Sequence, residues 1–357
     1  MNQYEKTSDL LIAHYQKYPK LQIQDIFKFI YQSSFGCEHM VTSLDGVTAY
    51  ILKEFADCSV PLEDNGLLDK LDGVYSRVHL GWLNRGLSAE TLGKLFFASA
   101  KKEPEGMKNL LCKLETAKEL VRENILDFPQ MEFDAAAEEW GSGGYPAIHH
   151  SEAFRSVYHP AYRVVADRYV DFLQLFAEID KLIQKGSAVI AIEGGSASGK
   201  TTLSGILSEI YDCTVFHMDD FFLRPEQRTA KRFAEPGGNI DRERFLEEVL
   251  IPLKNGKPIQ YRRFDCGSMK IAPAVQVVPQ KLTVIEGAYS MHPELADIYD
   301  LSVFLDVSSA VQKARIQKRN SPELARRFHE EWIPMEKLYF SEMDVKNRCS
   351  LILSVTE

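Results

Sequence analysis

The sequence predicts a mainly α-helical N-terminal domain, residues 1–185, followed by an α/β domain, residues 186–357, with helices on both faces of a parallel sheet. Helical periodicity dominates the first part, whereas apolar strand-like runs alternate with helical patterns in the second. A glycine-rich loop directly follows the first of these apolar runs. The 357 residues also favour two domains over one. We place the boundary at Gly186 and Ser187.

Five segments of the first part show apolar residues three and four positions apart, a spacing typical of amphipathic helices. They lie near residues 7–17, 22–33, 44–56, 88–101 and 106–126. Ser88 is expected to cap the fourth of them. A further apolar stripe from Tyr162 to Ile183 predicts one long helix that ends at Lys185, and no alternating strand pattern precedes residue 186. This helix is expected to pack within the domain; homo-oligomerisation through its face is the alternative.

The second part alternates between strand-like and helical patterns. The strand-like runs lie at 188–193, 213–218, 281–285, 301–305 and 350–355. The helical patterns lie at 200–211, 241–254, 308–319 and 323–340. This alternation predicts a parallel sheet, whose ligands bind beyond the carboxyl ends of the strands.

The glycine-rich loop matches the phosphate-binding pattern G-x-x-x-x-G-K-[ST] between an apolar strand and a helix. Its backbone N–H groups and the positive end of the following helix favour a bound polyphosphate, so we predict an ATP site. In this pattern Lys200 reaches the β- and γ-phosphates and the Thr201 hydroxyl binds Mg²⁺. A glycine-rich turn without a ligand is the alternative. The predicted site comprises Gly194, Gly195, Ser196, Ala197, Ser198, Gly199, Lys200, Thr201 and Thr202.

Carboxylates follow two of the predicted strands at the edge where the loop lies. Asp219 and Asp220 follow the second strand, and a carboxylate there can orient an acceptor hydroxyl and take its proton. Glu286 ends the apolar run 282–285, which is the form of a Walker B element whose acid holds Mg²⁺. A solvated acidic turn and an ordinary strand end are the respective alternatives.

Arginine is concentrated in the second part, where 12 of the 18 arginines lie. Guanidinium groups suit bidentate phosphate contacts, which favours phosphate chemistry in this part. Arg315 and Arg319 share a helix face, and Arg326 and Arg327 follow. We interpret the cluster as a lid over the transferring phosphoryl group; a solvated basic face is the alternative.

Together these motifs resemble the uridine kinase family of P-loop kinases, which includes nicotinamide riboside kinase and relatives of pantothenate kinase and phosphoribulokinase. The resemblance covers nearly all of the second part and implies an α/β P-loop kinase domain. The Asp-Asp-Phe-Phe and Trp-Ile-Pro runs are most similar to nicotinamide riboside kinase. The matching elements are 194–202, 218–222, 239–241 with Phe245, 261–265, 284–287, 315–319, 326–328 and 332–335.

The resemblance implies a role for each matching residue. Asp219 would be the general base, Asp241 would hold the ribose hydroxyls, and Glu286 would associate with Mg²⁺. Arg315, Arg319 and Arg326 would contact the phosphates from the loop and the lid, with Lys200 as the phosphate-loop lysine. Acceptor binding is expected at Asp241, Tyr261, Phe264 and Asp220.

Two departures from the family pattern concern acceptor recognition. Uridine kinases usually carry a histidine that reads the pyrimidine after the segment matching Tyr261, but no histidine lies between His217 and His292 here. Pro236, Gly237 and Gly238 also predict an unusual turn beside the acceptor pocket. The expected activity is transfer of the γ-phosphoryl group of ATP to a small-molecule hydroxyl, foremost the 5′-OH of a nucleoside. An ATP-binding regulatory protein and a bifunctional protein are the alternatives.

The bulk composition narrows the class of protein. The net charge of −9 argues against a general nucleic-acid binder, and no apolar run approaches the length of a membrane span. The first residues do not resemble a signal peptide. The six cysteines are scattered without a C-x-x-C pair, which favours reduced thiols and a cytoplasmic protein.

The first part contains three stretches of small and polar residues that could build a second pocket or activity. They are 34–39, 77–82 and 141–146, the last followed by His149, His150, Ser151, His159 and Arg163. None of the histidines is paired with an acid at the spacing of a strong metal motif, so structural histidines are the simpler interpretation.

Overall fold

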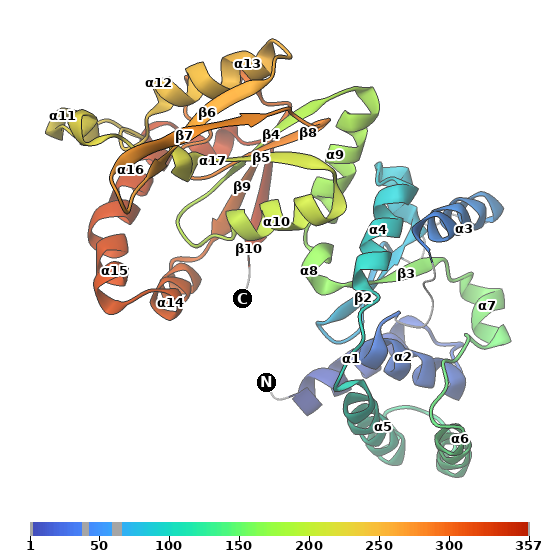
Figure 1. Cartoon of the computed structure of the whole chain (residues 1–357). Coiled ribbons are helices and arrows are strands. Elements are labelled where there is room, and N and C mark those ends of the chain that lie inside the picture. Colours follow the sequence, from blue (N-terminus) through green and yellow to red (C-terminus); the bar gives the residue numbers. More distant parts are fainter. Residues whose placement is uncertain (1–2, 38–42, 59–65, 356–357) are drawn as a thin grey trace. The chain divides into compact units, whose positions relative to one another are not determined.

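The computed structural model describes residues 3–37, 43–58 and 66–355 (Figure 1). The chain divides into two compact units, residues 1–180 and residues 181–357. None of the helices in these described ranges combines the length and the apolar character that crossing a membrane requires.

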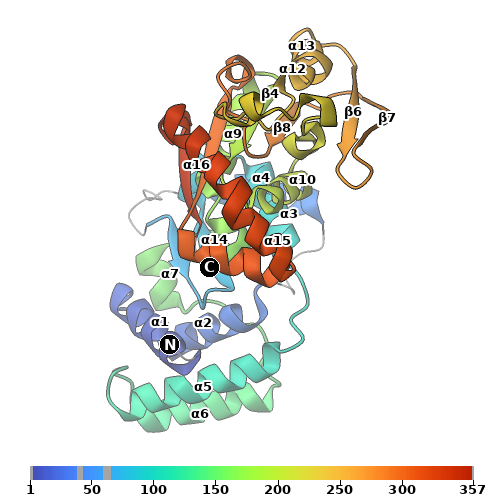
Figure 2. The same ribbon diagram turned by 90° about the vertical axis from the view of Figure 1, so that its left-hand side faces the viewer.

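The first unit is largely helical, as predicted, and all five predicted helices are confirmed. Ser88 caps the fourth helix by accepting a hydrogen bond from the N–H of Thr91 at 3.0 Å. Figure 2 shows α5 and α6 side by side. Helix α5 packs against α2, and Phe133 and Trp140 of α6 contact Phe27 of α2. The helices are α1 (Gln3–Lys17), α2 (Ile23–Phe35), α3 (Leu44–Asp57), α4 (Ala89–Ser99), α5 (Gly106–Arg122), α6 (Gln130–Ser142) and α7 (Glu152–Tyr158).

A three-stranded antiparallel sheet, which the sequence analysis did not predict, crosses this unit. The central strand β2 (Tyr75–His79) pairs with β1 (Leu68–Lys70) and with β3 (Tyr162–Ala166). Strand β2 is buried along its whole length, so it lacks the alternation of polar and apolar residues that identifies a half-exposed strand. A short 3₁₀ helix, η2 (Leu80–Arg85), follows β2.

The predicted helix from Tyr162 to Ile183 is therefore wrong in its first part. Residues 162–166 form β3, and helical structure begins only at α8 (Asp167–Val170) and continues in α9 (Leu173–Lys185). The β-branched Val164 and Val165 suit a buried strand, and pairing with β2 outweighs the local helical spacing.

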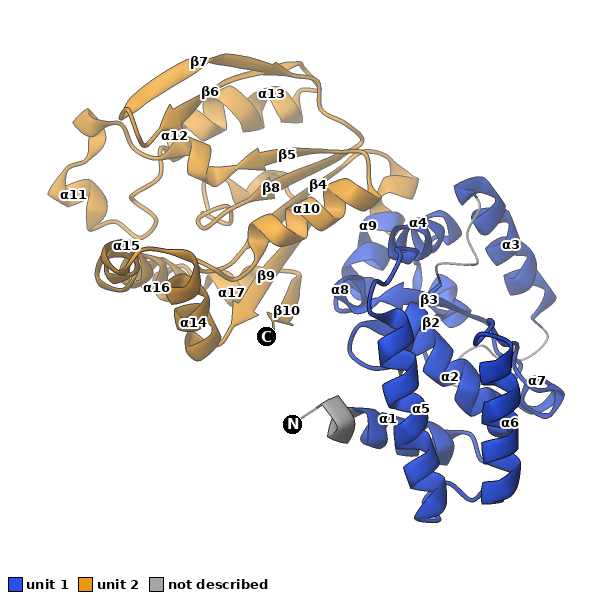
Figure 3. Ribbon diagram, turned by 60° about the horizontal axis from the view of Figure 1, so that its bottom comes forward, with its two compact units in different colours: residues 1–180 blue, residues 181–357 orange. Residues whose placement is uncertain are grey.

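The second unit has five parallel strands at its centre, and all five predicted strands are confirmed (Figure 3). Their order across the sheet is β10-β9-β4-β8-β5, which places the first strand of the unit in the middle. After β4 the chain first adds β5 and β8 on one side of it and then β9 and β10 on the other side. In such a sheet, ligands bind in the crevice at the carboxyl end of the strand where the direction changes, here β4. The strands are β4 (Ala188–Glu193), β5 (Cys213–His217), β8 (Leu282–Glu286), β9 (Leu301–Val307) and β10 (Leu351–Val355).

Helices of this unit occupy the predicted positions between the strands. Helix α10 packs against β4, β5 and β8. Two of the helical stretches contain a π-helical turn, η5 (Leu246–Leu250) and η7 (Phe328–Trp332). The helices are α10 (Lys200–Ile210), α11 (Ala230–Phe233), α12 (Arg242–Phe245), α13 (Ile251–Lys254), α14 (Ser309–Arg319), α15 (Pro322–Arg327), α16 (Ile333–Glu342) and α17 (Val345–Arg348).

An antiparallel hairpin that the periodicity did not predict also lies in this unit. Its strands are β6 (Ile259–Asp265) and β7 (Lys270–Val277), which pair with a register shift between Arg262 and Phe264. Ile259, Tyr261 and Phe264 are its buried positions, and the first two belong to the same hydrophobic core as Phe216 of β5.

Candidate active site

The phosphate loop leaves the end of β4 and enters α10 at Lys200, as the motif predicted. Gly194 has φ of +146°, a conformation that side chains rarely adopt, and a Cβ there would lie 2.9 Å from the carbonyl oxygen of Leu305. Gly199 (φ +106°) precedes the first residue of α10. The backbone therefore turns tightly at the N-terminus of a helix, where a polyphosphate is favoured.

Two charged side chains, Lys200 at the end of the loop and Glu336 of α16, form hydrogen bonds with polar groups of this loop. The Lys200 ammonium donates to the carbonyls of Gly194 and Gly195, both at 2.9 Å. The Glu336 carboxylate accepts from the Ser196 N–H at 2.9 Å and from the Ser196 hydroxyl at 2.6 Å. Glu336 is an anion on a loop amide, so it stands where a phosphate oxygen would be bound. Glu336 was not among the site residues predicted from the sequence.

Glu286 ends β8 next to the start of α10. One of its oxygens accepts from the Thr201 hydroxyl at 3.2 Å and contacts His217 Nδ1 at 2.6 Å. This contact raises the pKa of His217 above its ordinary value despite partial burial. Thr201 and Glu286 supply hard oxygen donors beside the phosphate loop, and such donors fit Mg²⁺. These two predicted metal-binding residues are therefore neighbours.

Asp219 lies in the 3₁₀ turn η3 (Met218–Phe221) that directly follows β5. Burial raises the pKa of this carboxyl; the neighbouring Glu286 charge adds to the effect and the Lys200 charge opposes it. Asp219 also lines a cavity of about 640 Å³. The side chain therefore lies within the electrostatic reach of the phosphate loop and faces a space large enough for a small molecule.

Aromatic side chains line much of this cavity. They come from the segment after β5, from α11, from the segment after β8 and from the π-helical turn η7. Asn239 and Ser196 contribute polar groups. The aromatic members are Phe222, Phe233, Tyr289, Phe328 and Trp332.

None of the four residues predicted to bind the acceptor lines this cavity. Asp220 forms an ion pair with Arg263 at 3.3 Å. Asp241 is buried, caps α12 through the Arg244 N–H at 3.3 Å, and also forms an ion pair with the Arg244 side chain. Tyr261 and Phe264 are buried on β6. Their assignment to acceptor binding stays a prediction.

The predicted turn before Asn239 is confirmed. Gly237 has φ of +72°, and the N–H of Gly238 donates to the carbonyl of Glu235 at 2.9 Å. Asn239 then lines the cavity, so the turn ends at the cavity wall. Its influence on acceptor choice stays a prediction.

The arginine cluster is divided between the loop and the cavity. Arg315 donates to the carbonyl of Ala197 at 3.3 Å, which places it at the phosphate loop. Arg327 lines the cavity and forms an ion pair with Glu331 at 3.1 Å. Arg319 and Arg326 are exposed. The catalytic roles of Arg315, Arg319 and Arg326 stay predictions.

Glu193, the last residue of β4, is a further site residue that the sequence analysis missed. It is fully buried and accepts from the N–H groups of Gly194 at 2.8 Å and Met291 at 3.0 Å, and from the Tyr339 hydroxyl at 3.0 Å. Burial raises the pKa of Glu193 to about 7. This carboxyl ties the start of the phosphate loop to the segment after β8 and to α16. The available signal in the sequence was a carboxylate at the end of an apolar run, directly before the glycine-rich loop.

Comparison with known proteins identifies the second unit. The model of the phosphoribulokinase and uridine kinase family matches residues 189–328. These residues form a domain of that family. The resemblance stated from the motifs is thereby confirmed, and the fold class of a parallel sheet with helices on both faces agrees with it.

Relatives of this kinase-family domain share moderate identity with it. Uridine kinase-like protein 3 of Arabidopsis thaliana is 29% identical over 149 residues, which are 39% of this chain and 32% of the relative. The uridine kinase of Latilactobacillus sakei is 26% identical over 157 residues, 41% of this chain and 72% of the relative. The chain thus spans about a third of the length of the plant relative.

Among solved structures, a possible uridine kinase from Bacillus stearothermophilus is similar to this chain with 21% sequence identity and a TM-score of 0.38. That match covers 50% of this chain and 99% of the other. The sequence matches to the plant and bacterial relatives described above span 39–41% of this chain.

Proposed function

We propose that this protein is an ATP-dependent kinase that transfers the γ-phosphoryl group of ATP to a hydroxyl of a small molecule, with the 5′-OH of a nucleoside as the acceptor. The observation that carries the proposal is the position of Asp219. This carboxyl lies close enough to Lys200 and Glu286 to interact with their charges, and it lines the aromatic cavity. It can therefore act on a hydroxyl that enters from the cavity while ATP occupies the loop.

The residues of the loop would bind ATP. Its backbone N–H groups would hold the polyphosphate, and Lys200 would exchange the carbonyls of Gly194 and Gly195 for phosphate oxygens. Thr201 and Glu286 would hold Mg²⁺, which neutralises charge on the phosphate oxygens when bound. Most of the rate enhancement would come from positioning and from charge stabilisation.

Asp219 would orient the acceptor hydroxyl by accepting its hydrogen bond. As the hydroxyl oxygen forms its bond to the γ-phosphorus, the bond to the β–γ bridging oxygen breaks and ADP leaves. The hydroxyl proton passes to the Asp219 carboxylate.

Two observations support a nucleoside as the acceptor. Relatives with similar sequences, among them those of Latilactobacillus sakei and Chlamydia pneumoniae, are named uridine kinases. The cavity volume of about 640 Å³ lies in the usual range for small-molecule sites, and its aromatic side chains suit a planar base. The absence of a histidine between His217 and His292 favours recognition of the base by other groups, among which Asn239 lines the cavity.

The test is the pair of variants Asp219→Asn and Asp212→Asn, assayed for ATP binding and for ADP release with nucleoside acceptors. Asp212 is exposed and precedes β5, at the other end of the strand from Asp219, so it is a matched control. We expect Asp219→Asn to lose about 10²–10⁴-fold in kcat while binding ATP normally, since general base catalysis contributes about that factor. Normal turnover by Asp219→Asn would exclude it as the base.

A further inference from the structure

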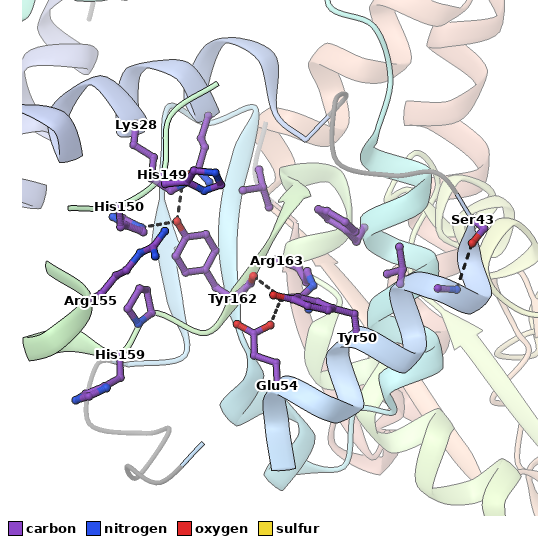
Figure 4. A pocket seen from close by; sticks show the side chains of 16 residues that line it. Lys28, Ser43, Tyr50, Glu54, His149, His150, Arg155, His159, Tyr162 and Arg163 are labelled. Atoms are coloured by element: carbon purple, nitrogen blue, oxygen red, sulfur yellow. Dashed lines mark hydrogen bonds and ion pairs between the residues drawn. The ribbon is translucent and has the colours of Figure 1, made fainter. Parts of the chain in front are cut away.

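A second pocket lies entirely within the first unit. Its volume is about 840 Å³, and it is lined by residues of α2, α3, α4, α7 and β3 together with the segments before and after α7. Figure 4 shows the side chains of Lys28, His149, His150 and Arg155 gathered around the hydroxyl end of Tyr162. The kinase-family match begins at residue 189, so it does not include this pocket.

Two cations stand close together at this end of the pocket. Burial lowers the pKa of Lys28 to about 8; the positive charges of Arg77 and Arg155 add to that effect, and the negative charge of Asp25 opposes it. Lys28 donates to the carbonyl of Ile148 at 2.9 Å, which leaves further N–H groups of its ammonium available. Within residues 3–37, 43–58 and 66–355, no carboxylate forms an ion pair with Lys28 or Arg155.

These two cations lie within a domain whose net charge is negative. Residues 1–185 contain 20 basic and 27 acidic side chains, so an unpaired pair of cations in a concave site is not a consequence of overall composition. Holding two like charges near each other costs free energy unless an anion lies between them. His149 and His159, both exposed at this pocket, add further hydrogen-bonding groups.

The wall behind these cations is fixed by buried hydrogen bonds. Asp25 accepts from His150 Nδ1 at 2.8 Å and from the Ser151 hydroxyl at 2.6 Å. Burial lowers the pKa of His150 to about 3, so its ring is neutral and its Nε2 accepts from the Tyr162 hydroxyl at 2.7 Å. Tyr162 is thereby held in one orientation without adding charge, and the site is preorganised for a ligand.

The other end of the pocket combines aromatic rings with one paired arginine. Arg163 is buried; its Nη1 donates to Glu54 at 2.7 Å, whereas its Nη2 has no hydrogen-bond partner. The guanidinium lies 5.3 Å from the Tyr50 ring and 5.9 Å from the Phe96 ring. This end suits an uncharged polar portion of a ligand, because Glu54 already balances the Arg163 charge.

We propose that this pocket is a binding site for a small phosphomonoester, with the phosphate group at Lys28 and Arg155 and the remainder of the molecule towards Arg163 and Tyr50. A dianionic phosphate balances both unpaired cations, whereas a single carboxylate would leave one of them uncompensated. The proposal does not depend on the kinase activity, because the residues that carry it belong to the first unit alone.

The test is isothermal titration of the full chain with ribose 5-phosphate, uridine 5′-monophosphate and, for comparison, acetate. All proteins carry Lys200→Ala, so that the phosphate loop contributes little to the binding observed. The variants Lys28→Met and Arg155→Ala remove one cation each, and Arg122→Ala removes an exposed arginine of α5 that does not line the pocket.

We expect at least one phosphomonoester to bind in the Lys200→Ala background and acetate to bind far more weakly. Lys28→Met and Arg155→Ala should each weaken phosphomonoester binding by about tenfold or more, whereas Arg122→Ala should leave it unchanged. Three results would overturn the proposal. They are no phosphomonoester binding in the Lys200→Ala background, unchanged phosphomonoester affinity when Lys28→Met or Arg155→Ala is added to that background, and acetate binding as tight as phosphomonoester binding.

Discussion

The hydrogen bonds of Asp25 predict a large effect of a nearly isosteric substitution, Asp25→Asn. The side chain is fully buried in α2, and its two oxygens accept four hydrogen bonds. Oδ1 accepts from His150 Nδ1 and from the Ser151 N–H at 3.0 Å, and Oδ2 accepts from the Ser151 hydroxyl and from the Gln22 N–H at 2.9 Å.

Asparagine retains only one acceptor oxygen, and its NH₂ group would face two of these donors. The Ser151 hydroxyl can rotate and His150 can change its tautomer, but the backbone N–H of either Gln22 or Ser151 must lose its partner. An unsatisfied buried donor, together with the lost charge assistance of the other bonds, should cost about 2–4 kcal/mol of unfolding free energy.

Urea unfolding followed by tryptophan fluorescence measures this cost. In a Trp332→Phe background the remaining tryptophans, Trp82 and Trp140, both belong to the first unit, so the signal reports that unit. Asp134→Asn, at an exposed position of α6, is the matched control and should change the free energy by less than about 0.5 kcal/mol. A change of that small size in Asp25→Asn would refute the argument that this carboxylate holds the pocket wall together.

Three further predictions concern both units. Burial alone would raise the pKa of Asp25, but the hydrogen bonds from His150, Ser151 and Gln22 outweigh burial and lower that pKa. The ionised Asp25 carboxylate should therefore stabilise the fold above about pH 4, and this stabilisation should be lost as the pH falls further. Acid unfolding of the wild type and of Asp25→Asn measures the difference. Gly205→Ala should stabilise α10 by about 0.5–1 kcal/mol, because alanine favours a helix and open space surrounds that position. Gly194→Ala should instead destabilise the second unit, because its φ of +146° strains any side chain. Thermal unfolding of the two variants measures both effects. Glu336→Ala should bind ATP several-fold more tightly by calorimetry, since it frees a loop amide; weaker binding would contradict this.

The parts of the fold that were predictable from sequence are those with a simple hydrophobic periodicity or a sequence motif of fixed spacing. The five strands of the second unit are short, mostly apolar runs, and the phosphate loop has fixed spacing between Gly194 and Lys200. Asp219 and Glu286 were identified because the carboxyl ends of parallel strands meet at one edge of the sheet.

The remaining parts depended on tertiary contacts that a local pattern does not contain. Strand β3 carries helical spacing in the sequence but pairs with β2, and hairpin β6–β7 has only three buried positions on β6. Glu336 lies 140 residues from the loop amide that it contacts. Glu38 and His39, which belonged to one of the predicted pocket stretches, lie outside the described residues.

The pocket of the first unit was only partly foreseen. His149, His150, His159 and Arg163 were identified as candidates because small and polar residues surround them in the sequence, and all four line the pocket. Lys28 was not identified, because its position within α2 looks like an ordinary polar position of an amphipathic helix.

The measurement that tests the central claim most directly is mass spectrometry of acceptors incubated with the full chain, ATP and Mg²⁺. The panel contains uridine, cytidine, nicotinamide riboside, pantothenate and simple sugars, and Lys200→Ala is the control. The account predicts that at least one nucleoside gains a phosphoryl group with the wild-type protein and none does with Lys200→Ala. ATP binding by the wild-type protein without phosphorylation of any acceptor would contradict the kinase assignment and favour an ATP-binding regulatory protein.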